Sequence, residues 1–271
     1  MNATTQRLCV WGGIGFILLW GLGFWAFAGF IPLPTPNTTA EAVQAYYREH
    51  TNAIRFGLML TTTGSALLGP YIGVISVQLR RIEGRNAPLA QTQLALGAIL
   101  VLEFIYPVFV MQAIAFRPDR PGGVVLAMYD VAWMTFIGVV STAAVQMIVI
   151  GIAMLRDRRA EPIFPRWLGY LSLWVGLLFC PGSLLVFFKD GPFAWNGIFS
   201  WWIPVVVFVI WIASMTITLL KAIKREEREW PEDDVSGDEV AALRAELRAL
   251  AGEVESLRGS TVPAPRESSS G

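Results

Sequence analysis

Long apolar stretches with few or no charged residues recur along most of the chain. A helix needs about 20 such residues to cross the roughly 30 Å of hydrocarbon in a bilayer. Charged residues make up only 15% of the 271 residues, against about 25% in soluble domains. This pattern excludes a soluble enzyme, a nucleic-acid-binding domain and a disordered scaffold. It predicts an all-α fold, a polytopic six-helix transmembrane bundle surrounded by the lipid bilayer.

The six transmembrane helices fall within residues 1–221, and segments rich in proline, glycine and charge separate them. The predicted ranges are 9–30, 54–79, 93–115, 127–154, 167–188 and 198–221. The first apolar run is longer than the roughly 7–15 residues of a secretory signal, and no small-residue cleavage site ends it. We therefore expect it to be retained as a membrane helix.

Basic residues are distributed unequally between the two sides of the predicted bundle. The segments on the side of the N-terminus hold 12 of them: Arg7, Arg80, Arg81, Arg85, Arg156, Arg158, Arg159, Arg166, Lys221, Lys224, Arg225 and Arg228. The opposite loops hold five: Arg48, Arg55, Arg117, Arg120 and Lys189. Because segments rich in Lys and Arg stay in the cytoplasm, both termini are predicted to be cytoplasmic.

Five tryptophans lie near the ends of the predicted spans. Trp11 and Trp167 are on the N-terminal side, and Trp195, Trp201 and Trp202 are on the opposite side. Tryptophan is enriched where a bilayer meets water, so these residues fit interfacial belts. Ordinary packing inside the bundle is the alternative.

The sequence contains few residues that could bind a metal or act as a catalytic nucleophile. The chain has one histidine, His50, and two cysteines, Cys9 and Cys180. Haem, di-iron and zinc sites need several such ligands, although a carboxylate-only site stays open. No pattern of a serine hydrolase, a zinc protease or a phosphate-binding loop occurs. We therefore expect no cofactor and no enzymatic activity.

The loop of residues 31–53 carries the signature of a short amphipathic helix. Thr38 and Glu41 have the spacing of a capping box. Five residues then share one helical face: Val43, Tyr46, Tyr47, His50 and Ile54. This helix is predicted to lie on the membrane surface or to cap the bundle. Its aromatic face either packs on the bundle or closes over a ligand.

One acidic residue, Glu103, falls at the middle of the predicted third span. Insertion of an acid at a helix centre costs about 2.5–3.5 kcal/mol, and such residues are candidates for function. Ser65, Ser141 and Thr142 are predicted at a similar depth, and Pro107 frees the backbone carbonyl of Glu103. Since no Lys or Arg shares this depth, we expect a neutral carboxylic acid that donates a hydrogen bond. The group is either a polar site or a structural link between helices.

A second polar pair is expected near the opposite end of the bundle. Arg55 and Asp130 lie one and three residues inside the second and fourth predicted spans. Both enter the membrane from the same side, so the sequence predicts an ion pair at the rim. Such a pair is more often a structural contact than a ligand site.

The C-terminal part changes abruptly in composition. A charged linker, 222–237, is followed by a predicted cytoplasmic helix, 238–258, and by a Ser- and Pro-rich tail, 259–271, expected to be disordered. Apolar residues recur in the helix at alternating spacings of three and four: Val240, Leu243, Leu247, Leu250, Val254 and Leu257. This seam predicts a parallel coiled-coil homodimer. A single helix lying on the membrane is the alternative.

Four strings of the membrane part carry a resemblance: Thr39-Ala40-Glu41-Ala42-Val43, Val77-Gln78-Leu79-Arg80-Arg81-Ile82-Glu83-Gly84, Phe116-Arg117-Pro118 and Gly191-Pro192-Phe193-Ala194-Trp195-Asn196-Gly197. Over about residues 40–220 the chain resembles an uncharacterised family of bacterial six-helix integral membrane proteins with no assigned activity. The resemblance implies a six-helix fold in a bacterial inner membrane. It implies no activity and no site residue.

Three functional classes follow from these features. The first is a membrane-anchored assembly or sensor protein that self-associates through residues 238–258. The second is a small transporter or ion-coupled carrier that uses Glu103 to bind a small molecule or ion. The third, an intramembrane enzyme, lacks the necessary cluster of reactive groups. The sequence favours the first class slightly, because the heptad seam is its stronger signal.

Overall fold

The computed structural model describes residues 2–229 and 244–254, and within them every regular element is a helix. Six helical segments are long and apolar enough to cross a membrane, as predicted. They are Ala3–Phe27, Thr51–Glu83, Pro88–Phe116, Gly122–Leu155, Arg166–Phe187 and Ile198–Glu229. The protein is therefore a multi-pass membrane protein. Each helix extends beyond its predicted range at one end or both, although the first ends at Phe27, three residues before its predicted end.

Three spans contain a change of helix type, and two others are interrupted α-helices. In chain order the elements are α1 (Ala3–Gly21), a π-helix (Leu22–Phe27), α2 (Ala40–Glu49), α3 (Thr51–Ala66), α4 (Leu68–Glu83), α5 (Pro88–Phe116), α6 (Gly122–Gly138), α7 (Ser141–Leu155), α8 (Arg166–Phe179), a 3₁₀-helix (Cys180–Phe187), a second π-helix (Ile198–Trp202) and α9 (Ile203–Glu229). Only the third span, α5, is one unbroken α-helix. The fourth span is interrupted near its centre, where two residues separate α6 from α7.

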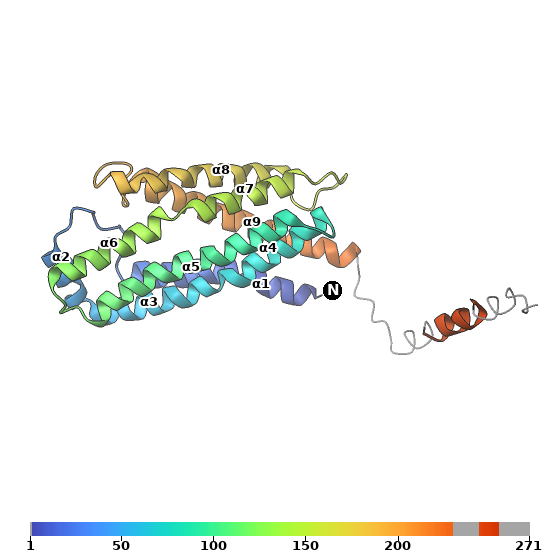
Figure 1. The fold of residues 1–271 in the computed structure, drawn as a ribbon, viewed down its shortest axis with the longest axis horizontal. Coiled ribbons are helices and arrows are strands. Elements are labelled where there is room, and N and C mark those ends of the chain that lie inside the picture. Colours follow the sequence, from blue (N-terminus) through green and yellow to red (C-terminus); the bar gives the residue numbers. More distant parts are fainter. Residues whose placement is uncertain (1, 230–243, 255–271) are drawn as a thin grey trace, which may run out of the picture. The chain divides into compact units, whose positions relative to one another are not determined.

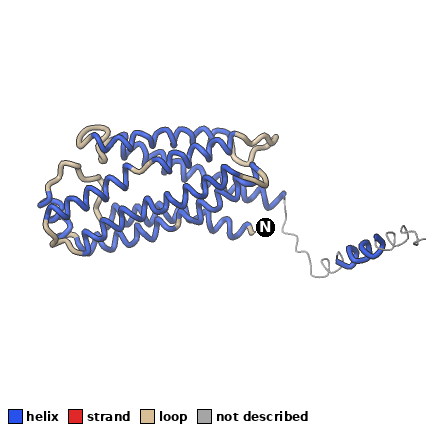
Figure 2. The backbone as a smooth tube through the Cα atoms, viewed as in Figure 1, coloured by secondary structure: helices blue, strands red, loops and turns tan. Residues whose placement is uncertain are grey.

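The spans run side by side, and their connections gather at two opposite ends (Figures 1 and 2). The side chains of Gln6 in α1, Gln78 in α4 and Glu226 in α9 are hydrogen-bonded to one another at 2.7–3.3 Å. These contacts place both the beginning and the end of the bundle at one end, called here the N-terminal end. The other end carries α2 and is called the α2 end.

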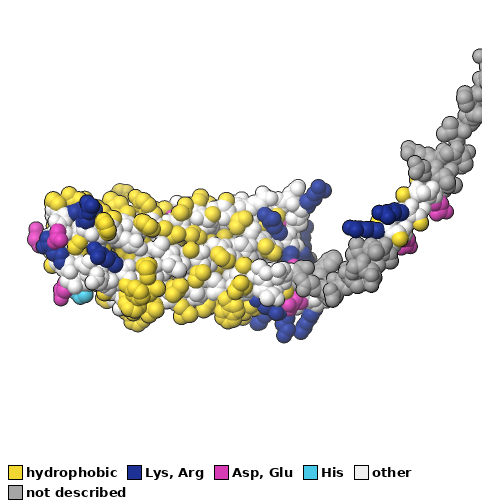
Figure 3. Space-filling view, turned by 90° about the horizontal axis from the view of Figure 1, so that it is seen from below, with side chains coloured by type: hydrophobic (Ala, Val, Ile, Leu, Met, Phe, Trp, Pro, Cys, Tyr) yellow, Lys and Arg dark blue, Asp and Glu magenta, His cyan; other side chains and the backbone are white. Residues whose placement is uncertain are grey.

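The surface of the bundle has the pattern of a membrane protein. Apolar side chains cover its middle, whereas basic and acidic side chains gather at its two ends (Figure 3). Leu102, Trp174 and Ile217, all within spans, are more than half exposed. Apolar side chains exposed at this depth are expected to face hydrocarbon.

The helix predicted in the loop of residues 31–53 is present as α2, and it caps the bundle. Val43 and Tyr47 are buried, and the Tyr46 hydroxyl donates a hydrogen bond to the Ala28 carbonyl at 2.7 Å. The predicted cap is wrong by one residue. Thr39, not Thr38, precedes the helix, and its hydroxyl accepts from the Ala42 amide at 3.3 Å.

The tryptophans divide between the two roles that the sequence left open. Trp11, Trp167 and Trp202 are exposed and suit an interfacial position, but Trp195 and Trp201 are buried. The indole of Trp195 donates to the Pro34 carbonyl at 2.7 Å. Packing therefore decides the place of Trp195 and Trp201, and neither forms part of a surface belt.

The predicted cytoplasmic segment is described in part. The last membrane helix, α9, continues through Glu229, so the first half of the predicted linker 222–237 is helical. Residues 244–254 form a separate helix, in which Leu247, Leu250 and Val254 are 61%, 53% and 62% exposed. The other predicted seam residues, Val240, Leu243 and Leu257, lie outside the described residues, as does the tail 259–271.

Candidate intramembrane site

The carboxyl group of Glu103 is held where the fourth span is interrupted. Glu103 is the sixteenth residue of the 29-residue helix α5. The hydroxyl of Thr142, the second residue of α7, donates a hydrogen bond to Glu103 Oε1. The structure thus brings together the acid and one of the hydroxyl residues that the sequence placed at its depth.

The interruption of the fourth span places the start of α7 next to Glu103. α6 ends at Gly138, the Val140 amide turns back to the Gly138 carbonyl at 3.0 Å, and α7 starts at Ser141 without a side-chain cap. The first amides of a helix lack intrahelical partners and carry a partial positive charge. A carboxyl oxygen is therefore stabilised at the start of α7, in either protonation state.

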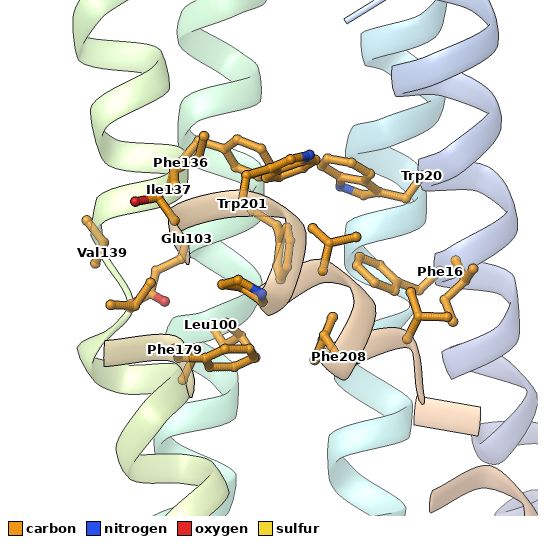
Figure 4. Close-up of a pocket in the computed structure, with 18 of the residues that line it drawn as sticks. Phe16, Trp20, Leu100, Glu103, Phe136, Ile137, Val139, Phe179, Trp201 and Phe208 are labelled. Atoms are coloured by element: carbon orange, nitrogen blue, oxygen red, sulfur yellow. The ribbon is translucent and has the colours of Figure 1, made fainter. Parts of the chain in front are cut away.

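A cavity of about 250 Å³ lies beside Glu103, and its walls are almost entirely apolar. Phe16 and Trp20 of α1, Phe104 of α5, Phe136 of α6 and Phe208 of α9 form much of its lining (Figure 4). Two other lining residues at mid-span, Val139 and Val209, are 43% and 41% exposed. The cavity therefore extends to the part of the surface that faces hydrocarbon.

Three polar atoms of the lining residues are buried without a hydrogen-bond partner among the described residues. They are Glu103 Oε2 and the indole nitrogens of Trp20 and Trp201. In Figure 4 the two indoles lie together at one end of the cavity, and Glu103, on α5, lies farther from that end. This is the end nearer α2, because Trp20 stacks on Phe24, which shares a core with Val43 and Tyr47. Buried polar groups nearly always have partners, so these atoms mark the polar positions of the site.

Two predicted members do not reach this site. Ser65 is buried, but its hydroxyl donates to the Thr61 carbonyl of its own helix at 2.8 Å. Ser141 is exposed, and neither serine lines the cavity. Residues of equal depth can face different directions, and adjacent residues such as Ser141 and Thr142 lie about 100° apart on a helix.

The structure does not bring Arg55 and Asp130 together as the predicted ion pair. The Arg55 guanidinium donates instead to the carbonyls of Ala115 and Phe116, at 3.1 and 3.2 Å. The last carbonyls of a helix have no amide partner within it. Arg55 therefore satisfies the end of α5, and among the described residues it makes no ion pair with Asp130.

The sequence interpretation missed the aromatic half of the site. The sequence leaves Trp201 open between an interfacial belt and ordinary packing, and it does not single out Trp20. Their rings belong to a connected cluster, in which Phe136 stacks on Trp20 at 5.4 Å and meets Trp201 at 5.6 Å between centroids. The available signal was the density of Trp and Phe in the first, fourth and sixth spans, which shows no direction in space.

The described residues contain no group of three or more His, Cys, Asp or Glu side chains that could hold a metal ion. Comparison with models of protein families, with curated proteins and with solved structures gives no match. The cavity and its three polar atoms are therefore the features on which a function can be built.

Proposed function

We propose that this membrane protein binds a small lipophilic molecule in the cavity beside Glu103, as a carrier or receptor. The observation that supports this most is a buried, partnerless carboxyl oxygen on the wall of an apolar cavity that extends to the lipid-facing surface. A molecule dissolved in the bilayer has direct access to such an opening. Its polar group would complete the hydrogen bonding of Glu103.

The composition of the walls argues against a hydrated ion as the main ligand. An ion loses much of its hydration on leaving water, and the loss must be replaced by several polar contacts. Here one carboxyl group and two indoles stand among aromatic and aliphatic side chains. The site therefore suits an apolar molecule with a few polar atoms better than it suits an ion-coupled mechanism.

A pair of substitutions on α9 tests this function. Val205 lines the cavity, whereas the adjacent Val206 is 52% exposed and does not. Val205→Phe should fill the cavity, and Val206→Phe is the matched control. The protein is extracted in native lipid discs, and bound apolar molecules are quantified by mass spectrometry. A molecule enriched with the wild type and Val206→Phe, but lost with Val205→Phe, supports the function. Equal content in all three overturns it.

A second proposed function is assembly through the C-terminal helix. Within residues 244–254, Leu247, Leu250 and Val254 are all more than half exposed, as an unpartnered coiled-coil seam requires. The proposed partner is a second copy of this chain, aligned in parallel. Attachment to a membrane bundle would raise the effective concentration of the two helices and favour their pairing.

Leu247→Asp tests the seam, and Ala245→Asp puts the same charge on the same helix away from it. We expect a dimer for the wild type and for Ala245→Asp by mass measurement in detergent, and a monomer for Leu247→Asp. A wild type that is monomeric, or that is unaffected by Leu247→Asp, contradicts the proposed dimer.

The orientation proposed from the basic residues, in a bacterial inner membrane, has its own test. A reporter fused after Arg258 should be cytoplasmic, and one inserted between Pro118 and Gly122 should be external. The same side for both reporters would contradict the three spans that separate this loop from the tail. The reverse assignment would place the termini outside.

A further inference from the structure

The three partnerless polar atoms of the cavity are all suited to donate hydrogen bonds. An indole nitrogen only donates hydrogen bonds, so Trp20 and Trp201 both require an acceptor. Glu103 Oε1 already accepts from Thr142. A carboxyl group among apolar walls favours its neutral form, and Oε2 then carries the proton and donates. All three partnerless atoms are therefore matched by acceptor atoms on a ligand.

These donors lie at two separate places in the cavity. The indoles of Trp20 and Trp201 lie together at the end nearer α2, and Glu103 lies on the α5 wall (Figure 4). Trp201 is only 5% exposed, so its indole meets the cavity and not bulk water. A ligand that satisfies both places needs acceptors at two positions, separated by an apolar body.

The walls between the donors are suited to a flat ring. Phe104 and Phe208 lie parallel within 19° at 6.3 Å between centroids, and Phe16 meets Phe104 edge-on at 5.2 Å. Aromatic faces and edges favour stacked or T-shaped contacts with another ring. Saturated chains would fill the same volume without using this geometry.

The size of the cavity limits what it encloses. Its volume of about 250 Å³ is below the roughly 300–1,000 Å³ of pockets that enclose drug-sized ligands. A single substituted ring fits, and a long tail does not. The exposed lining residues Val139 and Val209 mark the side on which a tail would leave for the bilayer.

We propose that the cavity binds the ring of a lipid-soluble quinone, with one carbonyl at Glu103 and the other at the indoles of Trp20 and Trp201. This inference rests on the proposed binding function and names its ligand class. The oxidised ring presents only acceptors, whereas each hydroxyl of a hydroquinone also carries a proton for which the three partnerless atoms offer no acceptor. The site is therefore selective for the oxidised form, by about tenfold if one hydrogen bond is lost.

The test is a titration of the full-length protein, in phosphatidylcholine nanodiscs, with a decyl-substituted benzoquinone. Quenching of tryptophan fluorescence reports binding. We expect saturable quenching, with affinity reduced about tenfold or more in Glu103→Leu and in Trp201→Phe. Glu103→Gln keeps a donor and should stay within a few-fold of the wild type. Trp202→Phe, at an exposed neighbouring position, is the control and should leave the affinity unchanged.

Competition experiments distinguish binding of a quinone from binding of any other lipophilic molecule. If decylcyclohexane reverses the quenching at concentrations similar to those at which the quinone binds, the cavity takes any apolar chain and the quinone proposal fails. If decylamine competes better and Glu103→Gln abolishes its binding, the site takes a cation and the proposal also fails. In both cases Val205→Phe still removes binding, so the proposed function stands. No saturable binding by the wild type, together with no molecule lost in Val205→Phe, overturns both.

Discussion

The two halves of the membrane bundle are packed by different kinds of side chain. The core nearer the N-terminal end consists largely of Ala, Val, Leu, Ile and Met, and its helices are regular α-helices. The core nearer the α2 end is rich in Trp, Phe and Tyr. Both π-helices and the 3₁₀-helix occur in that half. Small side chains let helices pack closely and regularly, whereas large rings hold them apart.

The cavity lies where these two kinds of core meet. Phe16, Leu100 and Ala143 belong to the core nearer the N-terminal end, while Ile137 and Trp201 belong to the other. The interruption of the fourth span falls between the same two cores. We infer that the cavity exists because the two halves pack differently. A larger side chain should therefore destabilise the closely packed half more than it destabilises the cavity.

The largest expected effect is in the closely packed half. A side chain at Gly151 of α7 would meet the Gly169 carbonyl at 2.8 Å and Leu173 at 2.9 Å. Gly151→Leu should therefore separate α7 from α8 and destabilise the protein by about 3 kcal/mol or more. Gly69→Leu has open space around it and is the control. Equal loss of thermal stability in both variants would contradict the close packing.

The next effect comes from the polar cluster at the N-terminal end. Glu226 accepts from the fully buried Gln78 at 2.8 Å and lies 3.6 Å from the Arg81 guanidinium. Glu226→Ala leaves buried donors without this acceptor and should cost about 1–3 kcal/mol. Lys224→Ala, at an exposed position on the same helix, should cost less than about 0.5 kcal/mol. Denaturant titration followed by helical circular dichroism compares the two variants. Equal losses in the free energy of unfolding would show that the cluster does not stabilise the fold.

Added volume in the cavity should have a smaller effect. Val205→Phe introduces a ring into the space of about 250 Å³, so it should change stability by less than about 1 kcal/mol, unlike Gly151→Leu. Thermal unfolding in one detergent measures both variants. A loss as large as that of Gly151→Leu would show that the cavity is not available to a side chain, and therefore not to a ligand.

The sequence predicts how deep a residue lies in the membrane better than it predicts the direction in which its side chain faces. The spans follow from local hydropathy, and the depth of Glu103 follows from its position along its helix, so both were predictable. The direction in which a side chain faces depends on how distant helices pack. Depth alone therefore grouped Ser65 and Ser141 with Glu103, and it paired Arg55 with Asp130. The break at Val139–Val140 arises within an apolar stretch whose composition gives no sign of it.

The smallest effect concerns the attachment of α2, which caps the aromatic half. The Tyr46 hydroxyl donates to the Ala28 carbonyl at 2.7 Å, and burial raises the pKa of this phenol above its ordinary value. A raised pKa means that the neutral phenol is favoured by the folded state. This contribution is fully present below the unfolded pKa near 10 and is lost as pH rises through the folded value. Tyr46→Phe should cost about 0.5 kcal/mol at neutral pH.

The same variant should then lose less stability on going to alkaline pH than the wild type does, because it has no phenol to ionise at this position. Hydrogen exchange of the α2 amides, measured at matched intrinsic rates at neutral and alkaline pH, isolates this local opening. Burial raises the pKa of the neighbouring Tyr47 still further. Ionisation of Tyr47 therefore reduces stability only at higher pH, and it does so equally in the wild type and in Tyr46→Phe. An alkaline increase in α2 exchange that is identical in the two proteins would mean that the Tyr46 hydrogen bond does not hold the cap. The aromatic half would then be closed by Val43 and Tyr47 alone.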